Sequence, residues 1–568
     1  MAYDILIKNG TVVDGTGMPR CRADVGIKDG LIVERGRLGG AAGRTIDATG
    51  LVVAPGFIDM HTHYDVQLAW DPLATSSCWH GVTTVLIGNC GFGIAPGRAS
   101  DADYLMRLMA RVEGMQLDVL RAGLDWTWES FGEFLDGLAR GLGVNVAAQV
   151  GHCPLRYYVM GEASYQRPST DDELKEMKAI LREAMARGAA GFSSDQTTNH
   201  VGAYGEPVPS RMGAWDELIE LAGVVGEFNH GVVGLNPHPG GGDITPEFRE
   251  TMKQMSFASG RPVLWNSLMH RWDQPSVYRG LIDFMAEAAA DGAQIYAMGR
   301  TQRMDLEFNF RFTAMFDLFP AWREVLAQPH DQKKRMMGDE EVRRRLREEW
   351  DARISRMSSR QPRFLEVART ALPKNKSMAG RKLVDLQRET GKHIVDLLLD
   401  VSLEEDLQTQ FMYVGTMNGD EEAVAQIVTS PYSVPGVSDA GAHVDMDCGV
   451  DFSDVLLGKW VRQRGVLSLE QAVNRLTFFS ASLLGLTDRG LIREGMAADV
   501  VVFDAETIGP AEREMVADLP GGGRRLVQRS DAVRTVIVNG QVLLEEGRHT
   551  GDLPGRIVSG GTRRANGA

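Results

Sequence analysis

The stretch that decides the fold is Val53 to Asp65, V-A-P-G-F-I-D-M-H-T-H-Y-D. Its Pro-Gly pair predicts a turn, and the apolar run that follows predicts a short strand ending in His61 and His63. Side chains two residues apart on a strand point to the same face, so both imidazoles can face one point, as a metal ion requires. The alternative is a strand end whose two histidines merely face solvent.

Outward from this stretch, apolar strand-like runs alternate with helical stretches, which predicts parallel βα units and an α/β fold. The helical stretch Asp171–Arg187 begins with a capping box formed by Thr170 and Glu173. Eight strands are expected, the number in a closed (β/α)8 barrel. They are Phe57–His61, Thr83–Gly88, Asn145–Gly151, Ala189–Ser193, Val232–Leu235, Pro262–Asn266, Ala293–Met298 and Val434–Asp439. An open doubly wound sheet is the competing architecture. The barrel is preferred because polar residues fall at the carboxyl ends of the strands, where a barrel gathers its active site.

Short strand-like segments with Asn-Gly or Asp-Gly turns occur near both ends of the chain. We therefore predict a small β-sandwich domain built from residues 1–54 and 487–568, around a barrel of residues 55–486. A charged helical segment, residues 311–406, interrupts the barrel before its last strand. Its charge is typical of a solvated helical face, and its position favours an inserted lid or an oligomer contact.

Composition excludes several classes of protein. The 568 residues are 43% hydrophobic and 24% charged, with a net charge of −15, which argues against a sequence-blind nucleic-acid binder. We expect no membrane segment, because the sequence contains no apolar run of 18 or more residues. We expect no secretory signal at the amino terminus, and five scattered cysteines predict free thiols in a reducing cytoplasm. A small-molecule substrate is expected; whether the chain forms a homo-oligomer stays open.

Two further residues at predicted strand ends carry chemistry. Cys90 follows the second strand between glycines, and its thiolate could ligate a divalent metal; the alternative is a buried structural cysteine. Asp439 ends the eighth strand and is expected to face the first strand across the barrel mouth. It could be a metal ligand, a general base, or both, and the alternative is a helix N-cap.

These motifs resemble the amidohydrolase superfamily, in the branch of the D-aminoacylases (N-acyl-D-amino-acid deacylases). The residues that carry the resemblance are Pro55-Gly56-Phe57-Ile58-Asp59-Met60-His61-Thr62-His63, His80-Gly81-Val82-Thr83-Thr84, Gly88-Asn89-Cys90-Gly91, Gly151-His152, Leu155-Arg156, Ser438-Asp439 and Gly495-Met496-Ala497-Ala498-Asp499. The resemblance spans nearly the whole chain. It implies a metal-dependent barrel with a flanking β-sandwich that both termini build.

The resemblance also implies roles for individual residues. His61 and His63 would be metal ligands, Cys90 would take the bridging or tight-site ligand position, and Asp439 would be the general base that also approaches the metal. One or two divalent ions, zinc first among them, are implied. Many relatives bridge two metals with a carboxylated lysine, but no lysine lies between Lys28 and Lys175, so a cysteine ligand would fill that place.

The chain also departs from the D-aminoacylase pattern. Strands five and six lack the histidines expected at their ends, and His238 and His270 lie a few residues beyond, as stand-ins or as surface residues. The Tyr-Pro-Tyr and His-Pro-Arg segments are absent too, which removes the residues expected to hold a substrate carboxylate. The substrate-binding candidates are therefore Arg156, Arg300 and Arg303 for the carboxylate, with His152 and His200 as further contacts. Each arginine has a structural or surface role as its alternative.

We therefore expect a metal-dependent hydrolase of a linear amide in an N-acyl-amino-acid-like substrate. The metal would activate a water molecule, and Asp439 would take its proton and pass it to the leaving amine. Two alternatives stay open: hydrolysis of a cyclic amide or carbamate, and a ligand-binding relative whose catalytic site has decayed.

Overall fold

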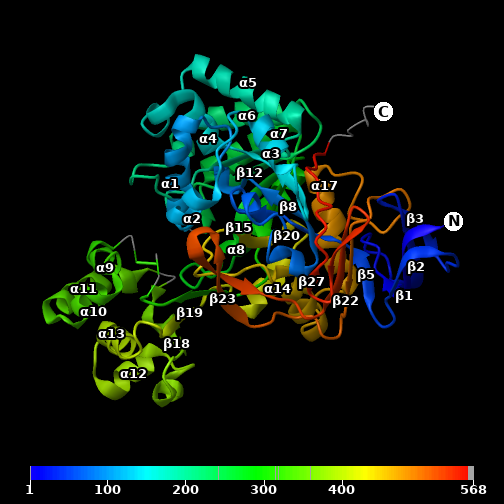
Figure 1. Ribbon diagram of the computed structural model, residues 1–568. Coiled ribbons are helices and arrows are strands. Elements are labelled where there is room, and N and C mark those ends of the chain that lie inside the picture. The colour runs from blue at the N-terminus through cyan, green and yellow to red at the C-terminus, as the bar shows by residue number, and fades with distance from the viewer. Residues whose placement is uncertain are drawn as a thin grey trace.

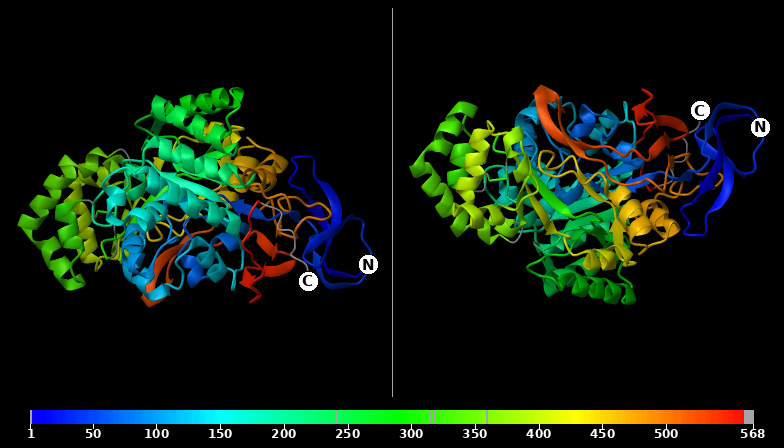
Figure 2. Two further views of the ribbon diagram at one scale, coloured as in Figure 1. Left: turned by 90° about the horizontal axis from the view of Figure 1, so that it is seen from above. Right: turned by 90° about the horizontal axis from the view of Figure 1, so that it is seen from below.

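The computed structural model describes residues 2–240, 242–311, 313, 315–316, 319–357 and 360–560. The six undescribed positions between 311 and 360 belong to the predicted insertion, and residues 561–568 belong to the predicted terminal domain. The molecule is elongated, with strands β1–β3 at one end and a helical lobe at the other (Figures 1 and 2). Among the helices of the described ranges, none is both long and apolar enough to cross a bilayer.

Parallel strands form the centre of the molecule, and all eight expected strands are present. In chain order they are β6 (Phe57–Asp59) with β7 (His61–Thr62), β8 (Val82–Ile87), β9 (Asn145–Ala148) with β10 (Val150–Gly151), β11 (Gly191–Asp195), β12 (Val232–Asn236), β15 (Val263–Leu268), β16 (Ile295–Gly299), and β20 (Ser433–Pro435) with β21 (Val437–Ala440). Parallel pairing runs β6-β8-β9 in one ladder, β10-β11-β12-β15-β16-β20 in a second, and β21-β7 in a third. One residue separates the two halves of each split strand, so the three ladders continue into one another.

One hydrophobic cluster takes a buried side chain from seven of the eight strand segments and from Ala190, which directly precedes β11. Its members include Ile58, Leu86, Ala147, Ala190, Val232, Leu264, Met298 and Val434. Interior side chains contributed by successive strands are the packing expected inside a closed barrel.

Helices connect the parallel strands, and α4–α7 lie along one side of them (Figure 1). Their bounds are α1 (Ala102–Val112), α2 (Leu117–Gly123), α3 (Phe131–Leu138), α4 (His152–Met160), α5 (Asp171–Arg187), α6 (Trp215–Gly226), α7 (Pro246–Ser259), α8 (Val277–Ala290), α14 (Glu421–Thr429), α15 (Phe452–Val455), α16 (Leu469–Asn474) and α17 (Ser480–Leu484). Helix α5 has the predicted bounds, and the side chains of Thr170 and Glu173 cap it reciprocally. Its buried residues Met177, Leu181 and Met185 recur at helical spacing, and full burial of such a side chain stabilises by about 1.5–3 kcal/mol.

Strands from both ends of the chain pair in one nine-stranded sheet, in the order β27-β26-β25-β22-β5-β1-β2-β3, with β4 on β1. They are β1 (Tyr3–Val12), β2 (Cys21–Lys28), β3 (Leu31–Gly36), β4 (Ala42–Asp47), β5 (Val52–Pro55), β22 (Val500–Phe503), β25 (Val533–Val538), β26 (Gln541–Glu545) and β27 (Arg548–His549). Strand β5 pairs with β22, and its chain then turns directly into β6. The second layer of a sandwich, and the domain boundaries, stay predictions.

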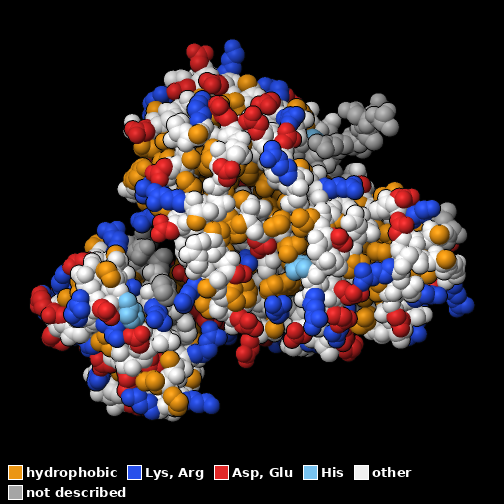
Figure 3. Space-filling view, viewed as in Figure 1, with side chains coloured by type: hydrophobic (Ala, Val, Ile, Leu, Met, Phe, Trp, Pro, Cys, Tyr) orange, Lys and Arg blue, Asp and Glu red, His pale blue; other side chains and the backbone are white. Residues whose placement is uncertain are grey.

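The helical lobe lies within the predicted insertion. It contains α9 (Pro320–Leu326), α10 (His330–Gly338), α11 (Glu340–Ala352), α12 (Leu383–Thr390) and α13 (Ile394–Glu404). Three antiparallel strands join it to the centre: β17 (Met304–Phe308), β18 (Leu365–Arg369) and β19 (Gln410–Met417). The lobe has its own core, which includes Phe308, Trp322, Trp350 and Tyr413. Charged side chains of both signs cover its visible face (Figure 3), as expected for a solvated helical surface.

Candidate metal centre

The two histidines of the opening stretch lie at the end of the first parallel strand. Both side chains are buried, with 0% and 1% of His61 and His63 exposed. Strand β21 pairs in parallel with β7, and the backbone N–H of His63 donates to the carbonyl of Ala440 at 2.6 Å. The eighth strand therefore positions the backbone that carries both imidazoles.

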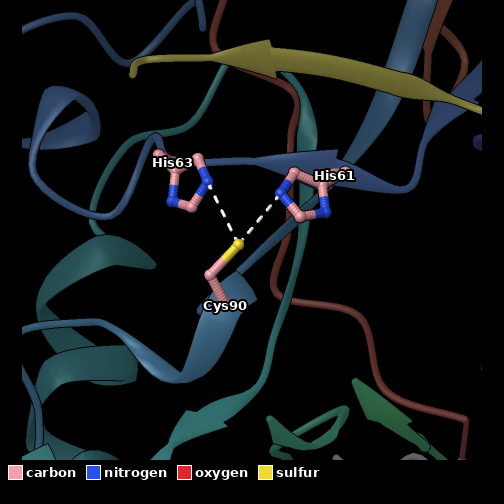
Figure 4. A group of neighbouring side chains, drawn as sticks. All are labelled: His61, His63 and Cys90. Carbon is pink, nitrogen blue, oxygen red and sulfur yellow. Dashed lines mark hydrogen bonds between the residues drawn. The ribbon is translucent and has the colours of Figure 1, made fainter. Parts of the chain in front are cut away.

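Cys90 lies in a tight turn after β8, opposite the histidines (Figure 4). It has a φ of 56°, a left-handed conformation that costs a non-glycine residue about 1–3 kcal/mol. A Cβ on Gly88 would lie 2.1 Å from the carbonyl oxygen of Gln149, and one on Gly91 would lie 2.7 Å from the amide nitrogen of Asp195. Only glycine fits at both places, so the turn packs closely against the third and fourth strands and presents the thiol to the centre.

The side chains of His61, His63 and Cys90 converge on one point (Figure 4). Cys90 Sγ lies 3.3 Å from Nε2 of His61 and 3.8 Å from Nε2 of His63. Asp439 joins them from the eighth strand, its Oδ1 atom 3.5 Å from Nε2 of His61 and 3.3 Å from Nε2 of His63. Among the residues that the structure describes, one group of three or more His, Cys, Asp or Glu side chains could hold a metal ion. It consists of His61, His63 and Cys90.

Electrostatics at this point favour a cation. Burial lowers the pKa of His61 to about 3, with a further lowering from the charge of His63, so His61 is neutral. Burial also lowers the pKa of His63, but the charge of Glu113 and the hydrogen bond to Asp439 outweigh it and hold the pKa well above its usual value. Burial raises the pKa of Asp439, yet the hydrogen bond and charge of His63 bring it far below its ordinary range. Without a metal, a proton on His63 supplies the positive charge that the carboxylates stabilise.

Glu113 is a member of this centre that sequence reasoning missed. It directly follows α1, only 3% of it is exposed, and its Oε2 atom lies 3.4 Å from Nε2 of His63. Burial raises its pKa, while the charge of His63 opposes the rise. The available signal was a carboxylate at the end of an amphipathic helix, a pattern that solvated helix ends share.

Asn236 and Asn266 lie where strands five and six reach the centre. The Oδ1 atom of Asn236 is 3.7 Å from Cys90 Sγ, and the Nδ2 atom of Asn266 is 3.9 Å from it. His238 instead contacts the carbonyl of Gln196 at 3.3 Å. His270 packs against the rings of Trp272 and Tyr278, with Nε2 4.0 Å from Asp420. Neither of these two histidines contacts the metal-ligand candidates.

A cavity of about 240 Å³ adjoins the centre at these two asparagines. Its lining also includes His200, Trp265 and Arg271, the carboxylate of Asp243, and the apolar side chains of Ile244, Met269 and Met417. A larger cavity of about 650 Å³, lined by Arg111, Met515 and Arg524 among others, contains none of the four donor residues or the two asparagines. The smaller cavity is therefore the candidate substrate pocket.

The three predicted arginines lie away from this cavity. Arg156 is fully buried and forms an ion pair with Glu217, at 2.6 Å to Oε2. Arg300 pairs with Asp447 at 2.6 Å, and Arg303 pairs with Asp305 at 2.6 Å. None of them lines the pocket, and we do not carry them into the proposal.

The two further predicted histidines have different positions. His152 is fully buried, with Nε2 2.8 Å from Glu217 and Nδ1 2.9 Å from the hydroxyl of Ser194, so neither ring nitrogen is left for a substrate. His200 lines the pocket, and its Nδ1 atom lies 2.6 Å from Oδ2 of Asp195. Of the five residues predicted to contact the substrate, His200 lines the pocket and the other four do not.

Comparison with known proteins identifies the family. The model of the amidohydrolase family matches residues 44–544. This chain belongs to the amidohydrolase family. It is a hydrolase of amide C–N bonds, and its fold is the family's barrel type, shared with D-aminoacylase.

Individual relatives cover this amidohydrolase almost end to end. D-aminoacylase of Alcaligenes xylosoxydans xylosoxydans is 29% identical over 98% of this chain and 98% of its own. A structure on the functional role of the binuclear metal centre in D-aminoacylase has a TM-score of 0.65 at 24% identity, covering 98% of this chain and 100% of that one. N-acyl-D-glutamate deacylase from Bordetella bronchiseptica, complexed with zinc and a phosphonate inhibitor, has a TM-score of 0.65 at 23% identity, with the same coverage.

Proposed function

We propose that this amidohydrolase removes the acyl group from N-acyl-D-amino acids, using one zinc ion bound by His61, His63 and Cys90 and the general base Asp439. The observation that carries the proposal is the convergence of two imidazoles, one thiol and one carboxylate on a single buried point. The substrate class comes from the relatives, which include a D-aminoacylase and an N-acyl-D-aspartate deacylase.

The donor spacing fits zinc. With bonds of about 2.1 Å to nitrogen and 2.3 Å to sulfur, tetrahedral N and S donors lie about 3.6 Å apart. The separations of Cys90 Sγ from the two Nε2 atoms, 3.3 and 3.8 Å, bracket that value. Nitrogen and oxygen donors would lie about 3.4 Å apart, and Asp439 Oδ1 lies 3.5 and 3.3 Å from the same nitrogens.

The side chains nearest Cys90 support a count of one ion. The other side chains that contact Cys90 are the amides of Asn236 and Asn266, which carry no charge. Glu113 adds one carboxylate near His63 but no imidazole. A second divalent ion would need anionic or imidazole donors to balance its charge, and neutral amides are poor ligands for zinc.

The protein's own groups then have defined tasks. His61, His63 and Cys90 would hold the zinc ion, which would supply Lewis acidity for the scissile carbonyl and for a water molecule. Asp439, kept ionised by its surroundings, accepts the proton of the attacking water. Arg271 lines the pocket, and we assign its guanidinium, which pairs with Asp273 at 2.8 Å, to the substrate's carboxylate in place of the three predicted arginines.

The finer features of the fold belong to the same proposal. We infer that the eight strands close into one barrel, because β21 pairs with β7 and seven of the eight strand segments share one interior cluster. Residues 1–54 and 487–568 would form the composite β domain, supported by the strands that both ends give to the nine-stranded sheet. The lobe of residues 311–406 would act as a lid, supported by its separate core and its strand connections.

The proposal is tested with zinc-loaded protein and paired substrates. N-acetyl-D-methionine should be hydrolysed, its L-enantiomer far more slowly, and an uncharged cyclic amide such as dihydrouracil not measurably. His61→Ala should lose zinc and turnover together. His393→Ala, in the helical lobe and paired with Asp351, is the matched control and should keep both. Turnover of the cyclic amide alone, or full activity in His61→Ala, would overturn the proposal.

A further inference from the structure

A second carboxylate–imidazole pair lies beside the pocket, and the reaction described so far does not use it. Asp195 is the last residue of β11 and is fully buried. Its Oδ2 atom accepts a hydrogen bond from Nδ1 of His200 at 2.6 Å, and its Oδ1 atom accepts one from the backbone N–H of Thr197 at 3.0 Å. Both oxygens are therefore engaged, and the carboxylate holds the imidazole in a fixed orientation.

The surroundings of His200 pack its ring in place at the pocket. Arg211 donates to the backbone carbonyl of His200 at 3.0 Å, and the ring of Phe92 meets the imidazole edge-on with ring centroids 5.7 Å apart. His200 lines the same cavity as Asn236 and Asn266, the two residues that contact Cys90. Because Asp195 occupies Nδ1, Nε2 is the nitrogen available to a molecule in the cavity.

Three ionisable groups act on this imidazole: Asp195 at the end of β11, Glu113 directly after α1, and His63 after β7. Burial lowers the pKa of His200 and the charge of His63 lowers it further, but the two carboxylates outweigh them and the pKa is raised. The two carboxylates therefore favour the imidazolium form, which is the form that has a proton to give.

We propose that His200, positioned by Asp195, is a catalytic residue that protonates the leaving nitrogen. The inference rests on the proposed amide hydrolysis and divides its proton transfers between two groups. The C–O bond to water forms as Asp439 takes a proton from that water. The C–N bond then breaks as Nε2 of His200 gives its proton to the nitrogen, which leaves as an amine. The proton on Asp439 returns to His200 through solvent, so the cycle closes without any other reagent.

Leaving-group dependence tests this assignment. His200→Gln should lower kcat for N-acetyl-D-methionine by about 100-fold or more, the usual contribution of a general acid. The same variant should lose less than about 10-fold on the p-nitrophenyl ester of acetic acid, whose leaving oxygen needs no proton. KM for the amide should change little. Asp195→Asn should repeat the pattern more weakly, and the alkaline limb of its pH–rate profile should move to lower pH, because loss of the carboxylate lowers the pKa of the histidine that must be protonated.

His238→Gln, a nearby histidine outside the pocket, is the control and should match the wild type on both substrates. Unfolding midpoints and zinc content of all variants separate loss of function from loss of fold. An equal loss on amide and ester, or a loss confined to KM, would overturn the assignment while leaving the proposed hydrolysis intact.

If the wild-type enzyme does not hydrolyse N-acyl-D-amino acids, the proposed function is wrong. His200 is then judged by NMR of its imidazole in zinc-loaded protein, assigned by its absence in His200→Gln. Methylphosphonate, a small tetrahedral anion, should shift the Nε2–H resonance on titration. An unchanged resonance would show that this nitrogen does not face the pocket, and the inference would be wrong.

Discussion

Asp439 Oδ1 lies 3.3 Å from Nε2 of His63, a contact between the first and the last of the central parallel strands. Residues so distant in sequence meet because β21 pairs with β7. The contact joins the proposed base to the proposed metal ligands, and it explains why the carboxyl stays ionised despite its burial. Each prediction below follows from this arrangement or from a neighbouring contact.

Asp439→Asn should lower kcat by about 1,000-fold, because the amide cannot accept the proton of water, whereas zinc should still bind through the three other ligands. Steady-state kinetics and elemental analysis of the same preparation measure both effects. Asp420→Asn, a half-exposed carboxylate near His270, is the control. Full turnover in Asp439→Asn would remove this residue as the base.

Zinc binding at pH 7 should release about two protons, because ligands must give up their protons to bind a metal. One comes from Cys90, whose pKa burial raises to about 12 in the metal-free protein. The other comes from His63, whose raised pKa keeps it charged; His61, with a pKa of about 3, contributes none. Calorimetry in two buffers of different ionisation enthalpy counts the protons, and Cys90→Ala should lower the count to about one. A count near zero in the wild type would contradict the assigned protonation states.

The buried Glu217 predicts a pH-dependent stability. Burial raises its pKa, but the hydrogen bond from His152 and the charge of Arg156 lower it to about 2 from an ordinary value of 4.5. Because the folded-state pKa is the lower one, this stabilisation is complete above about pH 4.5 and is lost as the pH falls toward 2. This difference between the folded and unfolded pKa corresponds to about 3 kcal/mol of folding free energy.

Glu217→Gln should therefore reduce the free energy of unfolding at pH 7 by about 3–5 kcal/mol, because it leaves Arg156 buried without its partner. Urea unfolding at pH 7, 4 and 3 should show a flatter pH dependence in the variant than in the wild type. Glu220→Gln, which breaks an exposed pair with Lys178, should change stability by about 0.5 kcal/mol or less. Equal effects of the two substitutions would contradict the buried network.

The sequence predicts features that depend on neighbouring residues in the chain, and it does not predict those that depend on tertiary contacts. Helix α5 and its capping box are local, and their predicted bounds match the structure. The convergence of His61, His63 and Cys90 was also expected, because strand alternation and the barrel order bring successive strand ends together. The positions of all eight central strands agree for the same reason.

The contacts of the arginines could not be predicted. A guanidinium is flexible, and whether it meets a ligand or a carboxylate depends on partners such as Glu217 and Asp447 that are remote in sequence. The roles of Glu113 and Asp195 could not be predicted for a similar reason. Nothing in the local sequence pattern distinguishes a buried carboxylate from a solvated one. Tertiary packing makes that distinction.

Arg271→Met tests the proposed carboxylate contact. Loss of the guanidinium should raise KM for N-acetyl-D-methionine by about 10-fold or more, the value of one charge-assisted contact, and should leave kcat nearly unchanged. The uncharged N-acetyl-D-methionine amide should respond little to the substitution. Arg303→Met, whose partner is Asp305 outside the pocket, is the control. If both substrates responded alike, Arg271 would have a structural role only.

X-ray absorption at the zinc edge, combined with zinc stoichiometry, tests the central claim most directly. The wild type should bind one equivalent of zinc with one sulfur at about 2.3 Å and nitrogen or oxygen donors at about 2.0–2.1 Å, and Cys90→Ala should lose the sulfur shell. A zinc shell without sulfur, or protein that binds no zinc when folded, would contradict a metal centre at His61, His63 and Cys90.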